Sequence, residues 1–174
     1  MKKHPLYIMV AVDENFGIGK NKTLPWNFKK EMQYFKKAST QTTDPNKKNM
    51  VVMGDVTYES LPPAFRPLRD RENVVLTRRD DFHPEGVKLA HSFEEIFTLA
   101  DDSIEKILIL GGESVYRFSI EKDELDGVYL TKIHHSFDCD AFFPQIPARF
   151  DKVTKLGEDT ENDIRLEFLL YEKS

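Results

Sequence analysis

The chain has 174 residues, a length typical of one domain that buries roughly 70% of the surface exposed by its unfolded chain. With 40% hydrophobic and 32% charged residues, it is too apolar for a disordered chain and too interrupted by charge for a membrane protein. The 25 basic and 30 acidic residues argue against nucleic-acid binding through a globally basic surface, but they allow a local basic pocket.

The N-terminal segment and the cysteine count favour a cytoplasmic protein. Met1–Pro5 runs into a short apolar stretch that Asp13 ends, whereas a secretory signal has a longer apolar stretch and small residues at its cleavage site. The only cysteine, Cys139, cannot form a disulfide within the chain, as suits a reducing compartment. We expect a cytoplasmic monomer that does not contact membranes.

Short apolar segments alternate with helical segments along the chain. The expected strands are Leu6–Val12, Asn49–Met53, Asn73–Thr77, Val87–Ala90, Lys106–Leu110, Gly127–His134 and Arg165–Tyr171. The expected helices are Phe28–Ala38, Val56–Leu61, Ser92–Ala100 and Ser114–Ile120. Several strands are almost continuously apolar, which is typical of a sheet covered on both faces, and the last strands follow one another without a helix. We therefore expect one α/β domain over residues 1–174, with a mostly parallel sheet that ends antiparallel.

Two of the helices begin with capping signals. Ser92 followed by Glu95 matches a capping box, and Asn27 is a good N-cap for the helix after Trp26. In that helix Phe28, Met32 and Phe35 form one apolar stripe, and Glu31 falls on the same stripe.

Helix spacing leaves two interpretations of Glu31. The carboxylate either lies at the edge of the stripe and reaches water, or points into a cleft where it binds a polar heterocycle and manages its proton. In the second case burial raises its pKa unless a charged ligand or a donor offsets the effect. Spacing alone does not decide between them.

A series of short sequence motifs, spread over nearly the whole chain, favours the second interpretation of Glu31. The first groups are Ala11-Val12-Asp13, Gly17-Ile18-Gly19-Lys20-Asn21, Leu24-Pro25-Trp26, and Glu31 with Tyr34-Phe35. The central groups are Val52-Met53-Gly54 with Thr57 and Glu59-Ser60-Leu61-Pro62, Arg66-Pro67-Leu68 with Arg71, and Val75-Leu76-Thr77-Arg78. The last are Ile109-Leu110-Gly111-Gly112 with Val115-Tyr116, Leu130-Thr131, Asp140 with Phe142-Phe143-Pro144, and Phe168–Tyr171. In this order they resemble the dihydrofolate reductase family.

The resemblance implies a mostly parallel eight-stranded sheet with an antiparallel C-terminal strand and about four flanking helices. It implies hydride transfer from NADPH to dihydrofolate, giving tetrahydrofolate. Glu31 would then bind the pterin through two hydrogen bonds and assist protonation of its ring, with Thr131 bonding the acid and Trp26 holding a water. Arg71 would bind the substrate's α-carboxylate, because a guanidinium binds a carboxylate in a bidentate manner.

The remaining site residues also follow from the resemblance. Substrate-binding residues would be Met9, Ala11, Leu24, Met32, Phe35, Leu61, Arg66, Arg71 and Leu110. Cofactor-binding residues would be Ala11, Ile18, Gly19, Gly54, Thr57, Leu76, Thr77, Arg78, His91, Gly111, Gly112, Val115 and Tyr116. Among these, Thr77 and Arg78 would hold the adenosine 2′-phosphate, and the glycines would let the backbone approach the pyrophosphate.

Two features of the sequence bear on the cofactor and on metal binding, and two alternative functions stay open. Asp55 and Val56 stand where many relatives carry basic residues, so a carboxylate near the cofactor phosphates could weaken the preference for NADPH. His134, His135, Asp138, Cys139 and Asp140 lack the regular spacing of metal ligands, so we expect no metal. Two alternatives to a dihydrofolate reductase remain: a related NADPH-dependent reductase of a ribosylated aminopyrimidine, and a non-catalytic nucleotide- or folate-binding module.

Overall fold

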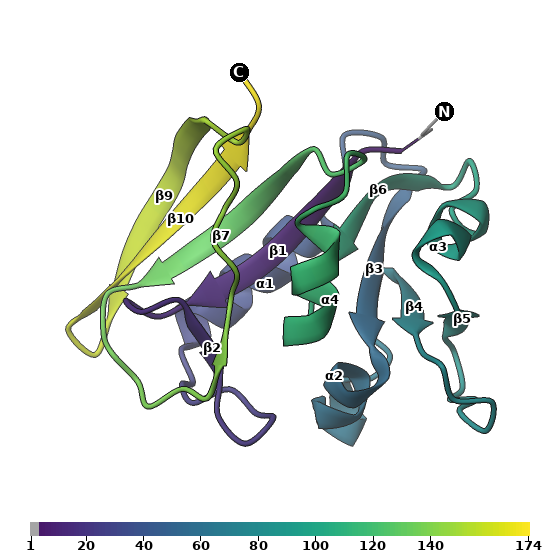
Figure 1. Cartoon of the computed structure of the whole chain (residues 1–174), viewed down its shortest axis with the longest axis horizontal. Helices are drawn as coiled ribbons and strands as arrows, with labels where there is room; N and C mark the ends of the chain where they lie inside the picture. Colours follow the sequence, from purple (N-terminus) through teal and green to yellow (C-terminus); the bar gives the residue numbers. More distant parts are fainter. Residues whose placement is uncertain (1–3) are drawn as a thin grey trace.

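One continuous sheet runs through the molecule, in the order β5-β4-β3-β6-β1-β7-β10-β9 (Figure 1). The computed structural model describes residues 4–174, so Met1, Lys2 and Lys3 of the predicted domain lie outside the described residues. The sheet strands are β1 (Leu6–Val12), β3 (Lys48–Gly54), β4 (Glu72–Leu76), β5 (Lys88–Ala90), β6 (Ile104–Ile109), β7 (Gly127–Ile133), β9 (Lys152–Glu161) and β10 (Ile164–Glu172). Two short strands, β2 (Gly17–Gly19) and β8 (Ala141–Phe142), pair apart from this sheet.

The helices are α1 (Lys29–Thr40), α2 (Asp55–Ser60), α3 (Phe93–Leu99) and α4 (Glu113–Ser119), with a short 3₁₀ turn at Pro63–Phe65. Every predicted strand and helix is present, and no boundary differs by more than two residues. The strands β5, β4, β3, β6, β1 and β7 are parallel, whereas β10 is antiparallel to β7. The predicted fold class is therefore confirmed.

Strand β9 was not predicted from the sequence. It is an edge strand that pairs only with β10, and most of its residues are exposed. Because neither of its faces is buried, its sequence has no apolar alternation, and its charged side chains suit an unpaired edge.

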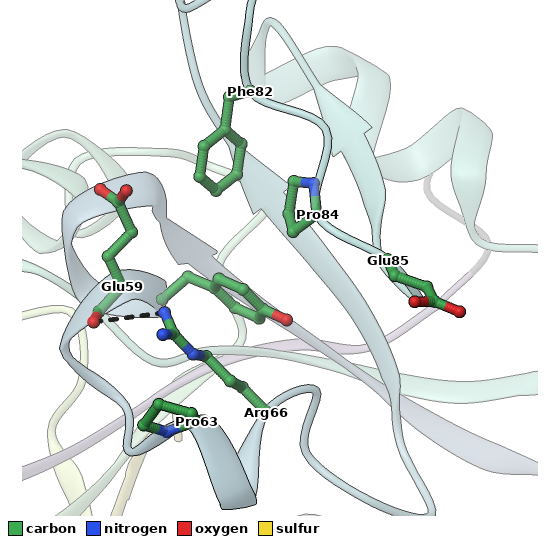
Figure 2. Close-up of a pocket in the computed structure, with 7 residues that line it drawn as sticks. Glu59, Pro63, Arg66, Phe82, Pro84 and Glu85 are labelled. Atoms are coloured by element: carbon green, nitrogen blue, oxygen red, sulfur yellow. Dashed lines mark hydrogen bonds between the residues drawn. The ribbon is translucent and has the colours of Figure 1, made fainter.

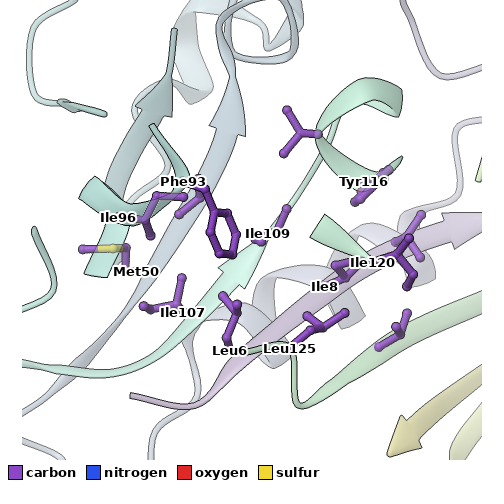
Figure 3. Packing of buried hydrophobic residues seen from close by; sticks show 14 of the residues in the cluster. Leu6, Ile8, Met50, Phe93, Ile96, Ile107, Ile109, Tyr116, Ile120 and Leu125 are labelled. Carbon is purple, nitrogen blue, oxygen red and sulfur yellow. The ribbon is translucent and has the colours of Figure 1, made fainter. Parts of the chain in front are cut away.

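Alternate residues of the central strands build two separate cores. On one face, Leu6 and Ile8 of β1 pack with Ile107 and Ile109 of β6 beneath α3 and α4, which contribute side chains such as Phe93, Ile96, Tyr116 and Ile120 (Figure 3). On the other face, Met9, Val51 and Leu108 pack against side chains of α1 and α2. The doubly covered sheet explains the nearly continuous apolar strands.

The parallel strands end at one edge of the sheet, the lower edge in Figure 1. From this edge β3 continues into α2 and outward to β4, whereas β6 continues into α4 and in the other direction to β7. Such a reversal is the usual location of a ligand site in an open α/β sheet. Among residues 4–174, no helix is long and apolar enough to cross a membrane.

Candidate active site

Helix α1 begins against the β9–β10 hairpin. The predicted cap Asn27 is wrong: the N-cap residue is Phe28, and no side-chain hydrogen bond caps it locally. Instead the Glu161 carboxylate accepts hydrogen bonds from the backbone N–H groups of Lys29 at 3.0 Å and Lys30 at 2.9 Å. A carboxylate at this position satisfies free amides and complements the helix dipole. Glu161 thereby fixes the first turn of α1, which carries Glu31.

Glu31 is an acid without an internal partner. Its side chain is buried, with 9% relative exposure, and no hydrogen bond or salt bridge joins it to any other residue in the range 4–174. Loss of hydration raises the pKa of Glu31 from 4.5 to about 7. Of the two interpretations of this residue, burial is the one observed.

Two buried polar groups belong to other elements, and the charge of Glu31 acts on one of them, Tyr116. Strands β1 and β6 pair only as far as Ile8 and Ile109, and the Met9 carbonyl beyond them accepts a hydrogen bond from the Tyr116 hydroxyl at 2.9 Å. Burial raises the pKa of Tyr116, and the charge of Glu31 raises it further. The indole Nε1 of Trp26 is buried and has no hydrogen-bond partner within the described chain. A buried donor without a partner is suited to a water or ligand acceptor.

Thr131 lies in β7, in register with Ala11 of β1, and is buried. The hydrogen bond to Glu31 that the resemblance implies does not occur among the residues described. Both side chains therefore keep hydrogen-bonding capacity.

One face of α1 connects Glu31 to a buried cation. Glu31, Phe35 and Ser39 are spaced by four residues, so they follow one another along about 12 Å of the helix axis. Arg71 lies 5.8 Å from the Phe35 ring centroid, and its Nη1 donates to Ser39 Oγ at 2.9 Å. The sequence analysis missed Ser39, although continuing the four-residue spacing from Glu31 would have found it.

The Arg71 guanidinium forms no salt bridge in the described part of the chain, and the neighbouring Asp70 acts on it only through its charge. Its Nε donates to the Arg69 carbonyl at 2.8 Å, and burial lowers its pKa. A buried cation fixed by neutral groups is suited to an external anion. The α1 face thus places an acid at one end and a cation at the other.

The predicted apolar walls are less buried than a core would be. Met32 is 50% exposed and Leu24 is 55% exposed, so Met32 does not belong to the core as the stripe indicates. Phe35, Leu61 and Leu110 are half-buried around the cluster of Met9 and Val51. Exposed apolar side chains beside Glu31 leave apolar surface for a ligand.

Arg66 lies apart from the Glu31–Arg71 face. Its Nη1 donates to the Glu59 carbonyl at 3.3 Å, and its guanidinium carbon lies 5.8 Å from the Tyr58 ring centroid. It lines an open depression of about 320 Å³ together with Phe82 and Pro84 (Figure 2). Among the described residues no hydrogen bond or ring contact joins it to Arg71, so a role in substrate binding stays a prediction.

The starts of α2 and α4 meet at the point where the sheet reverses. The Gly54 N–H donates to the Gly111 carbonyl at 2.9 Å, and a Cβ on Gly112 would lie 2.9 Å from Thr57 Oγ1. Gly111 has φ of +124°, a conformation that favours glycine. Neither helix start has a side-chain cap, so first-turn amides of both converge here. Val115 and Tyr116 are buried in α4 just beyond.

The predicted 2′-phosphate residues follow the ends of β4 and β5. Leu76 is the last residue of β4, Thr77 comes next, and the His91 ring Nδ1 lies 2.9 Å from the Thr77 carbonyl oxygen. The Thr77 hydroxyl, however, donates to the Asp55 carboxylate at 2.6 Å. The sequence raised Asp55 as a departure but did not reveal this bond.

The remaining candidates lie in β2 and in the segment that follows β7. Ile18 and Gly19 belong to β2, which is hydrogen-bonded to β8. His134 contacts Glu167, Asp138 pairs with Lys20, and Cys139 contacts Asp13. Within residues 4–174, no three His, Cys, Asp or Glu side chains come together as metal ligands.

The fold and the site together define an α/β protein suited to an elongated ligand. Such a ligand would carry hydrogen-bond donors for Glu31 at one end and a carboxylate for Arg71 at the other.

Comparisons with known proteins are consistent with this definition. The family model described as "Dihydrofolate reductase" matches residues 5–173. A dihydrofolate reductase of Drosophila melanogaster is 41% identical over 95% of this chain and 96% of its own length. One of Bos taurus is 37% identical over 98% of each chain. The solved dihydrofolate reductase of Schistosoma mansoni superposes with a TM-score of 0.82, at 34% identity over 98% of this chain and 99% of that one. The chain belongs to the dihydrofolate reductase family, a family of oxidoreductases.

Proposed function

We propose that this protein reduces 7,8-dihydrofolate to 5,6,7,8-tetrahydrofolate with NADPH as hydride donor. The observation that carries the proposal is the α1 face, where the desolvated Glu31 and the buried Arg71 lie at opposite ends. A pterin offers an amino group and a ring nitrogen to the first, and the glutamate tail offers an α-carboxylate to the second. Met9, Ala11, Leu24, Met32, Phe35, Leu61 and Leu110 supply the surface between them.

Glu31 would orient the pterin and help to protonate it. An ionised Glu31 accepts two hydrogen bonds from the amino group and ring nitrogen, which fixes the ring. Because its pKa is about 7, Glu31 exchanges protons readily near neutral pH. Trp26 would hold the water through which a proton reaches the nitrogen beside the reduced carbon, and Thr131 would bond the acid once ligand is present. Dihydrofolate thus gains one hydride and one proton and becomes tetrahydrofolate.

The converging helix starts fit a dinucleotide. Gly111 and Gly112 would hold the pyrophosphate through backbone amides and Thr57 through its hydroxyl, with Val115 and Tyr116 beside them. Gly54, whose N–H is bonded to the Gly111 carbonyl, would let the backbone approach the pyrophosphate. Ala11, Ile18 and Gly19 would surround the nicotinamide, and Leu76, Thr77, Arg78 and His91 would hold the adenosine end. When bound, NADPH supplies the hydride.

Steady-state assays of purified protein test the proposal directly. We expect loss of reduced-nicotinamide absorbance when dihydrofolate and NADPH are both present, with tetrahydrofolate as the product identified by mass spectrometry. Turnover only with a ribosylated aminopyrimidine would favour the related reductase, and ligand binding without any turnover would favour a binding module. Either result would overturn the proposed reaction.

The proposal also covers the cellular compartment and the oligomeric state of the protein. We propose that the protein is cytoplasmic, because the single free thiol of Cys139 suits a reducing compartment, and that it is a monomer. Light scattering during gel filtration measures the mass, and a dimer would contradict the monomer.

A further inference from the structure

The side chains around Thr77 form a closed network. Gly54 and Leu76 are in register on β3 and β4, so the residues that follow them, Asp55 and Thr77, meet at the carboxyl edge of the sheet. The Thr77 hydroxyl donates to Asp55 Oδ2 at 2.6 Å and accepts from the Arg79 backbone N–H at 3.1 Å. Thr77 is buried, with 4% exposure. The hydroxyl proton is therefore committed to a carboxylate.

The second arginine after β4 belongs to the same network. Arg79 Nε lies 3.4 Å from Asp55 Oδ2, and Arg79 Nη2 lies 3.1 Å from Glu59 Oε1. The guanidinium carbon also lies 4.5 Å from the Phe82 ring centroid. Two carboxylates thus hold the charge of Arg79, whereas Arg78 is exposed and forms no salt bridge within residues 4–174.

Asp55 therefore acts on two groups at the predicted phosphate site, the Thr77 hydroxyl and the Arg79 guanidinium, and leaves Arg78 free of a salt bridge within residues 4–174. It accepts the hydrogen bond that the Thr77 hydroxyl donates, attracts the Arg79 guanidinium, and places a negative charge beside any bound phosphate. The same carboxylate is suited to accept a hydrogen bond from a ribose 2′-hydroxyl, as acidic residues do in NAD sites. Asp55 disfavours a 2′-phosphate and favours a 2′-hydroxyl.

We propose that Asp55 is a specificity-determining residue that narrows the preference for NADPH over NADH, so that this protein binds both. The inference rests on the proposed function, because it places the adenosine end of the cofactor at Thr77 and Arg78. It concerns binding, so it can be measured without turnover.

The test is calorimetric titration of the free protein with NADPH, NADH, adenosine 2′,5′-bisphosphate and adenosine 5′-monophosphate. Asp55→Asn removes the charge and keeps an acceptor for Thr77; Asp55→Ala removes both. The matched control is Glu59→Gln, which removes one charge from the same helix and the same Arg79 but does not contact Thr77. Circular dichroism and thermal melts establish that each variant is folded.

We expect Asp55→Asn to raise the ratio of NADPH to NADH affinity by about tenfold, the effect of removing one charge that directly opposes a phosphate. Asp55→Ala should raise it at least as far, and Glu59→Gln by less than about threefold, because its pair with Arg79 is exposed. The bisphosphate and monophosphate should follow the same order.

An Asp55→Asn ratio equal to that of the wild-type protein, or to that of Glu59→Gln, would overturn the inference while leaving the proposed function intact. If neither dinucleotide binds the wild-type protein, the proposed function fails and the inference fails with it. Dinucleotide binding without reduction of dihydrofolate would remove the proposed reaction but not the role of Asp55.

Discussion

The candidate site has two regions, the α1 face and the end of β4, and they differ in whether their buried polar groups have partners within the protein. Along α1, Glu31 and the indole N–H of Trp26 are buried without hydrogen-bond partners, and Arg71 forms no salt bridge, within the described residues. At the end of β4, Thr77 and Arg79 are both bonded to Asp55. Unpartnered buried groups reduce the stability of the free protein and gain their partners from a ligand, whereas paired groups stabilise the free protein and have less to offer.

The largest effect is expected at the unpartnered acid. Glu31→Gln keeps the shape of the side chain but cannot carry the charge or the proton, so we expect turnover of dihydrofolate to fall roughly a hundredfold or more. Initial rates with saturating NADPH measure the change. Activity within about threefold of wild type would show that Glu31 is not the group that handles the proton.

The pH dependence of the free energy of unfolding tests the burial of Glu31 without substrate. The pKa of Glu31 is about 7 in the folded protein and 4.5 unperturbed, so the folded state binds the proton more tightly. This contribution is complete below the unperturbed value and is lost as the pH rises through about 7, a difference of about 3 kcal/mol. Relative to Glu31→Gln, the wild-type protein should lose about that much stability between about pH 4 and about pH 8 in urea unfolding. Parallel profiles for the two proteins would contradict the burial of Glu31.

A smaller effect on activity is expected from substitution of Arg71, near the C-terminal end of α1. Lysine cannot reproduce the two parallel hydrogen bonds of a guanidinium to a carboxylate, so Arg71→Lys should raise the KM for dihydrofolate about tenfold or more, with kcat little changed. Arg69→Lys is the control, because only the backbone carbonyl of Arg69 contacts Arg71. Equal KM values for the two variants would argue against a carboxylate at Arg71.

At the end of β4, where the polar groups are paired, a substitution should lower the stability of the protein more than its affinity for ligand. Thr77→Val removes a hydroxyl that already bonds Asp55 and Arg79, so we expect a loss of about 1 kcal/mol in the free energy of unfolding. NADPH affinity should change by less than about threefold, because the hydroxyl is already bonded to Asp55 and Arg79, and Arg78 and His91 would remain to hold the adenosine end. Thr98→Val, at an exposed position in α3, controls for the change of side chain. A tenfold loss of NADPH affinity in Thr77→Val would mean that the hydroxyl binds the phosphate despite Asp55.

Local patterns predicted most of the fold. The continuous apolar strands and the apolar stripes located every helix and all sheet strands except β9, because burial imposes a period on the sequence. The capping signal at Ser92 was also correct, since its hydroxyl accepts from the Glu95 backbone N–H at 3.3 Å. The partner of the Glu95 carboxylate is the His91 N–H, one residue before the cap. The local sequence thus located the helix start, but not each of its hydrogen bonds.

The sequence by itself determined the helices, the strands of the main sheet other than β9, the place of Glu31 on the apolar stripe of α1 and, through the order of its motifs, the family. The tertiary structure decided which groups are paired. Glu161 replaces Asn27 at the start of α1, and Asp55 takes the hydroxyl of Thr77. The physical reason is one of range: helix and strand periods reflect neighbours a few residues apart, whereas these carboxylates meet donors 22 and 132 residues away in the chain. Only the packing of the sheet brings such groups together.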